Sequence, residues 1–496
     1  SDTHGHIFPV NYASNCPEHS GLLNLAAQVE KGGNTLVLDG GDSLQGTPLT
    51  QYYLENRDQW PVHPVAAAFN AMGLDYFTLG NHDFNFGYEA LRDYLQAMDG
   101  VCLCTNVEDL GGELRIRPWA VHTLANGLRV GITGVVTDFV NVWEQPQNLE
   151  RIRVTDAFQA ARATCAALRE QCDVCVCIYH GGFEEELETG RVLSDSGENL
   201  ACKIARELDF DLLLTGHQHM AVEGVNLSGT YAVQPPANAG QFLHISGKWE
   251  GTRSSFRSRL TAVGAVHPAE PYQSLLPLEN AVQEWLDQPI GELAHPIPPE
   301  GKLDAALHGS RVAALFNQVQ LAETGADFSC TSLGNDPVGL ASPVTMRGVT
   351  AAYLFANTLV VLEVTEEVLR QTLERCASYF TLVDGQPQIS EEFLLPKVEH
   401  YNYDFYAGLA YTFDLRRPVG SRVIRLAKLD GSPLGGGTFR LCTSNYRATG
   451  TGGYEILREC PVLWRGGVEM PDLTARYIQT HSPVPQLHNA EMRVIW

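Results

Sequence analysis

Carboxylate, imidazole and amide side chains follow the apolar runs in the first half of the chain, most of them beside a glycine. They stand in five short segments: Asp2-Thr3-His4, Gly41-Asp42, Gly80-Asn81-His82-Asp83, His180, and Gly216-His217-Gln218-His219. Such side chains together suit two divalent transition metals (Mn, Zn, Fe or Co) better than Mg or Ca alone. Two ions about 3.5–4 Å apart can clamp a phosphoryl group and generate hydroxide from water near neutral pH. The residue types therefore predict a dimetal centre that acts on phosphoesters.

The segments that position these side chains alternate between two patterns. Strand-like apolar runs lie at 35–40, 76–80, 128–136, 174–180 and 210–216, and helix-like stretches lie at 21–31, 63–73, 89–98 and 155–171. This alternation predicts an α/β layered fold with a largely buried sheet, closed by β hairpins at 241–262. Because ligands bind at the carboxyl ends of strands in such sheets, the five segments are expected to converge on one crevice.

The second half has a different pattern. Prolines accumulate towards residue 300, with a helix-like stretch at 279–288 between them, which favours a connector over 271–300. We therefore predict a first domain at 1–270 and a second at 301–496. In the second, helices are expected near 303–323 and 366–379, and strands at 360–365, 408–415, 422–429 and 438–445.

Composition narrows the function classes. The formal net charge is −24, from 34 basic and 58 acidic residues, which disfavours binding of long nucleic acids. No apolar run reaches the ~18 residues of a membrane-spanning helix. The 12 cysteines include Cys172, Cys175 and Cys177 in a strand-like run, where we expect buried thiols rather than a metal knuckle. The pattern at Ser1 is that of a loop that follows a strand, so we expect either preceding residues or processing of the chain.

Taken in order, the motifs D-x-H, GD, GNHD, H and GHxH resemble those of the calcineurin-like metallophosphoesterases. The stretches TMRGVTAAYLFANTLVVLEVT (345–365) and SNYRATGTGGY (444–454) resemble the C-terminal domain of the 5′-nucleotidase family. The resemblance spans essentially the whole chain. It implies a four-layer α/β/β/α metallophosphoesterase domain followed by an α+β substrate-binding domain.

The resemblance also implies roles for individual residues. One metal would be held by Asp2, His4, Asp42 and His219, and the other by Asp42, Asn81, His180 and His217, with Asp42 bridging. A metal-bound hydroxide would attack phosphorus, while His82 would stabilise the developing charge and assist the leaving oxygen. In the second domain, Phe355 and Tyr446 would sandwich the nucleobase.

Departures from the family pattern indicate a branch. The 5′-nucleotidases proper have Asp three residues after the catalytic histidine, whereas this chain has Asn85. The NGGGIR stretch is replaced by TSLGNDPVG at 331–339, and the acidic position of GGDGY by Gly452. The Asn85 pattern resembles the branch that hydrolyses 2′,3′-cyclic nucleotides and 3′-nucleotides, and the other two changes argue against an ordinary 5′-nucleotidase pocket. Replacement polar contacts are expected at four positions: Asn335, Arg347, Asn445 and Arg447.

Several alternatives stay open at this point. A 5′-nucleotidase and a nucleotide-sugar diphosphate hydrolase would use the same metals, and a two-metal nuclease is disfavoured by the net charge. A catalytically silent scaffold would be expected to lack at least one ligand, and none is lacking. The thiols favour a cytoplasmic location, whereas the resemblance favours a secreted or cell-surface one. The oligomeric state is not predicted.

Overall fold

The computed structural model describes residues 1–496 except 194–196, 252–253, 267–268, 356, 395–397 and 488–490. The chain divides into two units, Ser1–Gln283 and Glu284–Trp496. This division lies inside α8 (Ala269–Asp287), which occupies most of the expected connector and covers the helix predicted at 279–288 up to Asp287. The remainder of that connector contributes β17 (Pro289–Gly291) to the second unit.

The largest sheet of the first unit has the strand order β13-β14-β12-β11-β9-β8. Its strands are β8 (Trp119–Thr123), β9 (Arg129–Val136), β11 (Val174–His180), β12 (Leu212–Thr215), β13 (Val222–Leu227) and β14 (Thr230–Gln234). The four central strands are parallel. Every residue of β11 is buried, as expected for a strand covered on both faces. The strand predicted at 174–180 is confirmed with the same bounds.

A second, parallel sheet has the order β3-β4-β5-β7. Its strands are short: β3 (Leu38–Asp39), β4 (Tyr76–Phe77), β5 (Val101–Leu103) and β7 (Ile116–Arg117). Side chains of alternate residues of β11, Val174, Val176 and Ile178, form one apolar cluster with Leu103 of β5. The two sheets therefore pack face to face through this cluster.

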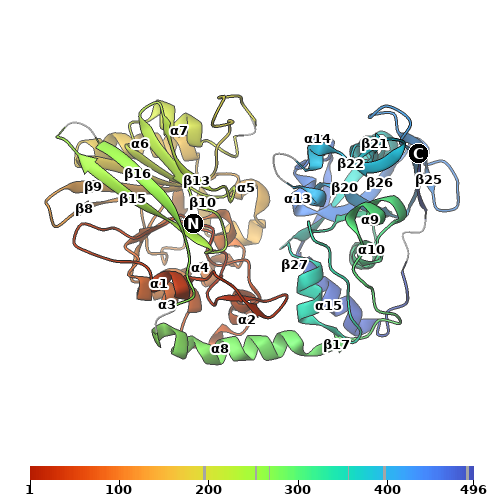
Figure 1. The fold of residues 1–496 in the computed structure, drawn as a ribbon, viewed down its shortest axis with the longest axis horizontal. Helices are drawn as coiled ribbons and strands as arrows, with labels where there is room; N and C mark the ends of the chain where they lie inside the picture. The colour runs from red at the N-terminus through yellow and green to blue at the C-terminus, as the bar shows by residue number, and fades with distance from the viewer. Residues whose placement is uncertain (194–196, 252–253, 267–268, 356, 395–397, 488–490) are drawn as a thin grey trace. The chain divides into compact units, whose positions relative to one another are not determined.

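Helices cover the outer faces of both sheets. Cys175, Cys177 and Tyr179 of β11 pack against α6 (Ala157–Arg169) and α7 (Ala201–Glu207), so these thiols are core residues as predicted. The other sheet carries α1 (Leu22–Ala26), α3 (Pro64–Met72) and α4 (Gly87–Ala97), with Tyr94 of α4 5.8 Å from Phe77 of β4 between ring centres. These layers confirm the α/β/β/α order, and β15 (Gln241–Trp249) and β16 (Ser254–Ala262) form the predicted hairpin (Figure 1).

The second unit is built on a five-stranded sheet of order β23-β18-β26-β20-β27. The strands are β18 (Phe328–Ser332), β20 (Thr358–Thr365), β23 (Asp404–Ala407), β26 (Thr438–Ser444) and β27 (Val462–Glu469). A smaller sheet joins β24 (Leu409–Asp414), β25 (Val423–Lys428) and β28 (Met492–Ile495). The main helices are α9 (Lys302–His308), α10 (Arg311–Thr324), α11 (Met346–Ala352), α12 (Glu366–Ala377) and α15 (Met470–Thr480).

The helix predicted at 303–323 is instead two helices. Gly309 has φ 92° between α9 and α10, and the Ser310 side chain accepts a hydrogen bond from Ala313 N at the start of α10. A glycine followed by a serine cap is the usual signal for an end and a new start.

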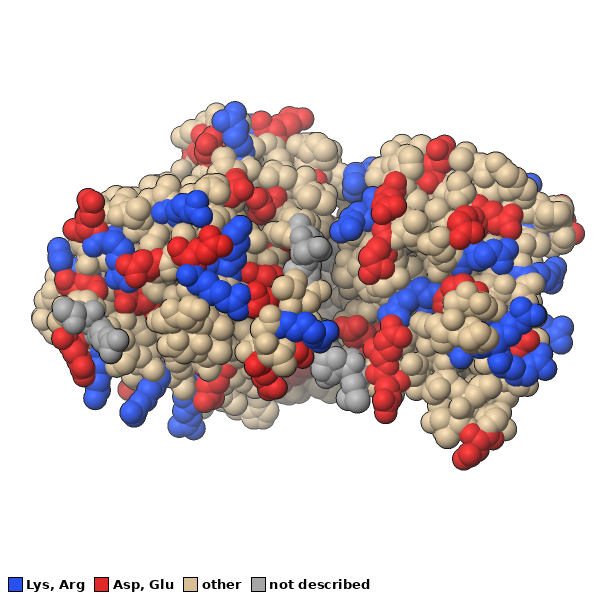
Figure 2. All heavy atoms as spheres, turned by 90° about the horizontal axis from the view of Figure 1, so that it is seen from above, with Lys and Arg blue, Asp and Glu red and all other residues tan. Residues whose placement is uncertain are grey.

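Two surface properties follow from the described residues. None of their helices combines the length and the apolar character that crossing a bilayer requires. Acidic and basic side chains are interspersed over the face shown in Figure 2.

Candidate metal centre

The predicted ligands lie where strands of the two sheets end. Asp42 follows β3, Asn81 follows β4, His180 is the last residue of β11, and His217 follows β12. Because these strands run parallel within their sheets, their carboxyl ends lie at one edge. The loop around Asp2 is joined to that edge by hydrogen bonds from Asp2 N to Gly41 O (2.8 Å) and from His217 N to Asp2 Oδ1 (2.9 Å).

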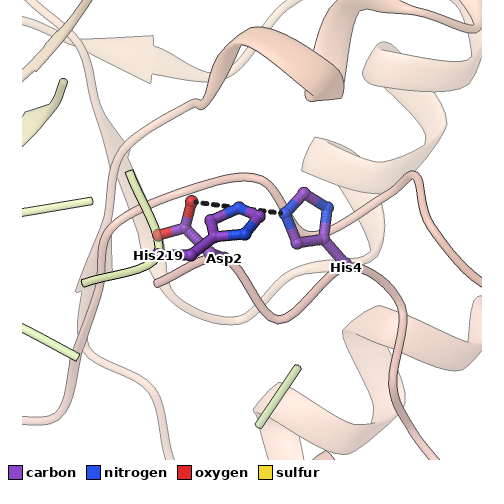
Figure 3. Close-up of side chains that lie close together, drawn as sticks. All are labelled: Asp2, His4 and His219. Carbon is purple, nitrogen blue, oxygen red and sulfur yellow. Dashed lines mark hydrogen bonds and ion pairs between the residues drawn. The ribbon is translucent and has the colours of Figure 1, made fainter. Parts of the chain in front are cut away.

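The first ligand group consists of Asp2, His4 and His219, whose ligand atoms lie within 4.8 Å of one another. His219 Nε2 is 3.0 Å from His4 Nε2 and 3.5 Å from Asp2 Oδ1. Figure 3 draws both contacts as dashed lines. Two imidazole nitrogens facing each other at this distance need a shared proton or a shared cation. The donor set of two imidazoles and one carboxylate is suited to a divalent transition metal.

The second ligand group consists of Asp42, His180 and His217, with the amide oxygen of Asn81 between them. His180 Nε2 is 3.1 Å from Asp42 Oδ2 and 3.2 Å from Asn81 Oδ1. His217 Nδ1 is 2.9 Å from the same Asn81 oxygen. Four oxygen and nitrogen atoms therefore converge on one point, as four-coordinate metal binding requires.

The outer nitrogen of three of these histidines is held by a second partner. His4 Nδ1 faces Gln45 O at 3.0 Å, and His180 Nδ1 faces Gly40 O at 2.7 Å. His217 is turned the other way, with its Nε2 3.0 Å from the carboxylate of Glu198. Partners of this kind fix the tautomer and the direction of a metal-binding imidazole.

The electrostatics of the described residues suit cations. Burial lowers the pKa of His4 to about 4, although Asp42 and Asp2 oppose this. Burial would also lower the pKa of His180, but Asp42 and Asp2 together raise it to about 9. Burial disfavours the Asp42 carboxylate as well, yet His180 and His82 hold the pKa of Asp42 well below its usual range. The buried carboxylates thus favour positive charge at the site, which a bound divalent cation would supply once the imidazoles are deprotonated.

The backbone at the ligands is left-handed. Asp2, His4, Asp42, His217 and His219 have φ between 48° and 71°. This region is sparsely populated by residues other than glycine and is concentrated at functional sites. The loops also approach closely: a Cβ at Gly80 would lie 2.1 Å from Asp42 Oδ1, so only glycine fits there.

A buried carboxylate fastens two of the ligand loops together. Asp83 accepts hydrogen bonds from the backbone N–H groups of Gly80, Asp42, Ser43 and Leu44, at 2.8–3.0 Å. Burial and then the charge of Asp42 raise the pKa of Asp83 to about 6, against the effect of these N–H groups. Asp83 therefore holds the Asp42 loop against the Asn81 loop without being a ligand.

His82 lies beside the first ligand group. Its ring centre is 5.6 Å from that of His4, and its backbone N–H donates to Asp42 Oδ1 at 2.7 Å. His82 Nδ1 is 2.8 Å from Asn85 Oδ1, so Asn85 occupies the orienting position predicted for it. No hydrogen bond from the described residues reaches the other ring nitrogen, Nε2, which could therefore face a substrate.

The predicted base-binding aromatics lie in the second unit. Phe355, after α11, is half-buried against the core, with its ring centre 6.1 Å from Tyr353 and 6.2 Å from Tyr401. Tyr446, in α13 (Asn445–Ala448), is 38% exposed. Tyr401 is therefore an aromatic side chain beside Phe355. It is an aromatic neighbour that the sequence motifs did not identify.

The four predicted polar contacts all have partners within the fold. Arg447 is buried and binds Asp404, Thr451 O and Tyr401 O, so we assign it to the fold rather than to a substrate. Arg347 forms an ion pair with Asp287 at 2.6 Å.

The two asparagines also contact the backbone. Asn335 bonds Val398 O and His400 N, at 2.9 Å each, and Asn445 Oδ1 accepts from Thr358 N at 3.2 Å. These bonds place both side chains in the fold of the second unit, and a role in substrate binding remains a prediction.

The sequence motifs did not identify the residues that contact the candidate ligands without being ligands themselves. Glu198 and Trp143 contact His217, with the Trp143 ring stacked 5.4 Å from the imidazole. Neither lies in a recognisable motif, and each is separated from His217 by many residues. Asp83 could have been identified, because it lies within the GNHD motif.

Two family models match the chain. Residues 1–221 match the calcineurin-like phosphoesterase model, and residues 289–459 match the 5′-nucleotidase C-terminal domain model. Among solved structures, a Staphylococcus aureus protein, described as a candidate 5′-nucleotidase in complex with alpha-ketoglutarate, is similar. It has a TM-score of 0.85 and 29% identity, over 99% of this chain and 98% of that one.

Curated relatives are more distant in sequence. The trifunctional nucleotide phosphoesterase protein YfkN of Bacillus subtilis is 24% identical over 96% of this chain, which spans only 37% of that protein. The 2′,3′-cyclic-nucleotide 2′-phosphodiesterase/3′-nucleotidase of Haemophilus influenzae is 24% identical over 91% of this chain and 79% of that protein.

Proposed function

The chain joins a calcineurin-like phosphoesterase domain to a 5′-nucleotidase C-terminal domain and so belongs to the 5′-nucleotidase family of metallophosphoesterases. From this we propose that it hydrolyses nucleotide phosphoesters. We further propose 2′,3′-cyclic nucleotides and 3′-nucleotides as its preferred substrates. The observation that carries the proposal is the pair of ligand groups with His82 beside them.

The donor sets favour Mn, Zn, Fe or Co at both positions. Two such ions, when bound, would neutralise phosphate oxygens and activate water for attack on phosphorus. The chain's own residues orient the substrate and move a proton. Because Asn85 occupies His82 Nδ1, a proton carried on Nε2 is the one that can pass to the ribose oxygen as it leaves.

Support for the substrate preference comes from Asn85. The GNHD-F-N pattern, with an amide where the 5′-nucleotidase pattern has a carboxylate, resembles that of the branch that cleaves 2′,3′-cyclic nucleotides, and relatives with that printed name match over 91% of this chain. Phe355 with its neighbour Tyr401, and the exposed Tyr446, supply aromatic faces on which a base can stack, worth about 1–3 kcal/mol per base.

The test is a substrate panel. The Mn²⁺-loaded protein is offered 2′,3′-cAMP, 3′-AMP and 5′-AMP, and kcat/KM is compared. We expect the first two to exceed 5′-AMP. A dominant 5′-AMP activity would reject the substrate preference and favour the second candidate function, a 5′-nucleotidase. The similarity to the Staphylococcus aureus structure supports that second candidate.

A further inference from the structure

A carboxylate lies directly behind the His82–Asn85 pair. Glu144 follows α5 (Val140–Trp143), and its Oε2 accepts a hydrogen bond from Asn85 Nδ2 at 2.7 Å. His82, Asn85 and Glu144 therefore form a chain of two short hydrogen bonds, of 2.8 Å and 2.7 Å.

The donors and acceptors of these two hydrogen bonds follow from the ionised state of Glu144. An ionised carboxylate only accepts hydrogen bonds, so the amide nitrogen of Asn85 must face Glu144. The amide oxygen then faces His82 Nδ1, which must carry a hydrogen to donate to it. Without Glu144 the amide could turn by 180° and present its nitrogen to His82, which would favour the opposite tautomer.

The carboxylate is itself held in place. Its second oxygen, Oε1, accepts from Gln145 N at 2.6 Å and from Asn148 Nδ2 at 2.9 Å. Asn148 lies in η3 (Pro146–Leu149) and also donates to the backbone oxygen of Asn85 at 2.9 Å. The segment therefore contacts Asn85 at both its side chain and its backbone.

The same segment contacts the metal centre. Trp143, the residue before Glu144, stacks on the metal-binding His217, with ring planes 23° apart. One short segment thus supports a predicted ligand and the predicted proton donor.

We propose that Glu144 is a positioning residue for His82: it fixes the amide of Asn85 so that His82 keeps its hydrogen on Nδ1 while the hydrogen on Nε2 passes to the leaving oxygen. The pair of Asn85 and Glu144 would thus take the place of the single Asp in the 5′-nucleotidase pattern that the sequence resembles. The inference rests on the proposed role of His82 in phosphoester hydrolysis.

A charge exchange tests the proposal. Glu144→Gln replaces the carboxylate that accepts from Asn85, Gln145 and Asn148 with an amide, whose own N–H group would face one of these donors. Asn85→Asp instead places two carboxylates in contact. Each single variant should lower kcat on 2′,3′-cAMP about 10- to 100-fold, part of the ~10²–10⁴-fold that a positioned general acid contributes. Asn85→Asp/Glu144→Gln reverses the polarity of the contact and should recover at least tenfold over either single variant.

Two controls separate positioning from damage. Glu150→Gln removes the same charge from an exposed site six residues away and should leave kcat unchanged. KM and bound metal should stay within about threefold of wild type in all variants, because only the chemical step is affected. Equal kcat for Glu144→Gln and Glu150→Gln would overturn the proposal, as would a double variant no faster than its parents.

A second measurement does not need turnover. In Zn²⁺-loaded protein with ¹⁵N-labelled histidine, the His82 signal, assigned by its loss in His82→Gln, should report hydrogen on Nδ1 in wild type and in the double variant. Glu144→Gln should change that tautomer. An unchanged tautomer would overturn the proposal for Glu144, whereas a wild-type protein without nucleotide turnover would reject the proposed function instead.

Discussion

Arg447 and Asp404 form a bidentate ion pair in which both side chains are 2% exposed, with Nε–Oδ2 at 2.8 Å and Nη2–Oδ1 at 2.9 Å. Breaking such a pair leaves an uncompensated buried charge. Arg447→Leu should therefore lower the free energy of unfolding by about 3–5 kcal/mol, measured by urea denaturation.

A double variant and a control variant test whether the loss of stability comes from the unpaired buried charge. Arg447→Leu/Asp404→Leu removes both charges and should be more stable than Arg447→Leu alone. Arg458→Leu changes an exposed arginine of the same unit and should cost less than about 0.5 kcal/mol. If the Arg447 and Arg458 variants unfold alike, Arg447 is free for another role, including the substrate contact that the motif suggested.

His82→Ala should reduce kcat on 2′,3′-cAMP by about 10²–10⁴-fold while both metals stay bound. The imidazole lies beside the ligand groups, and its Nδ1 contacts Asn85 rather than a ligand. Metal content measured by mass spectrometry on the same preparation checks the assignment. Loss of metal together with activity would make His82 a ligand.

Phe355→Ala and Tyr446→Ala should raise KM for nucleotides and leave hydrolysis of bis(p-nitrophenyl) phosphate almost unchanged. The reason is that this phosphodiester has no nucleobase to stack on the aromatic rings. Steady-state kinetics with both substrates makes the comparison. Parallel losses on the two substrates would show that the aromatics support the fold instead.

Glu198→Gln should weaken binding of the metal held by His217 by about 10–100-fold, because the carboxylate directs His217 Nδ1 towards the site. Competition with a chelator measures the affinity. Glu188→Gln, an exposed carboxylate in the same stretch, is the matched control and should bind metal like wild type. The idea fails if the two variants release metal at the same chelator concentration.

His63 predicts a pH dependence of stability in the first unit. Its side chain caps α3 between the rings of Tyr53 and Tyr94, and burial lowers the pKa of His63 to about 3. Below about pH 6.5 the unfolded state takes up a proton at this histidine that the folded state does not. The free energy of unfolding therefore decreases as pH falls, by at most ~1.4 kcal/mol per pH unit from this residue.

His63→Asn keeps a capping side chain and removes the titration. Its melting temperature should therefore fall less steeply than that of wild type between pH 7 and pH 5. His19→Asn removes an exposed histidine and should retain the wild-type slope. Parallel slopes for the His63 variant and wild type would contradict the explanation.

The convergence of the candidate metal ligands was predictable because short motifs follow strands whose carboxyl ends meet. His180 is the last residue of β11 and His217 lies two residues beyond β12, and the register of these neighbouring parallel strands brings them together. The short distance in sequence between each strand and its ligand was therefore enough for the prediction.

The supporting residues were not predictable in this way. Glu144 reaches Asn85 across 59 positions, and its contact depends on the path of a loop rather than on a strand register. Arg447 shows the opposite case, since it lies inside a nucleotidase-like motif but its partner Asp404 stands at the start of another strand. A motif gives the neighbours of a residue along the chain, whereas burial is decided by packing.

The left-handed backbone at the ligands has a consequence for redesign. Asp and Asn tolerate this conformation better than other residues with side chains, whereas β-branched residues are strained there. His4 and His219 could therefore be exchanged for Asp or Asn without remaking their loops, and such exchanges would shift the donor set towards oxygen and the metal preference towards Mn or Mg. A Thr or Val at the same positions would have to move the main chain first.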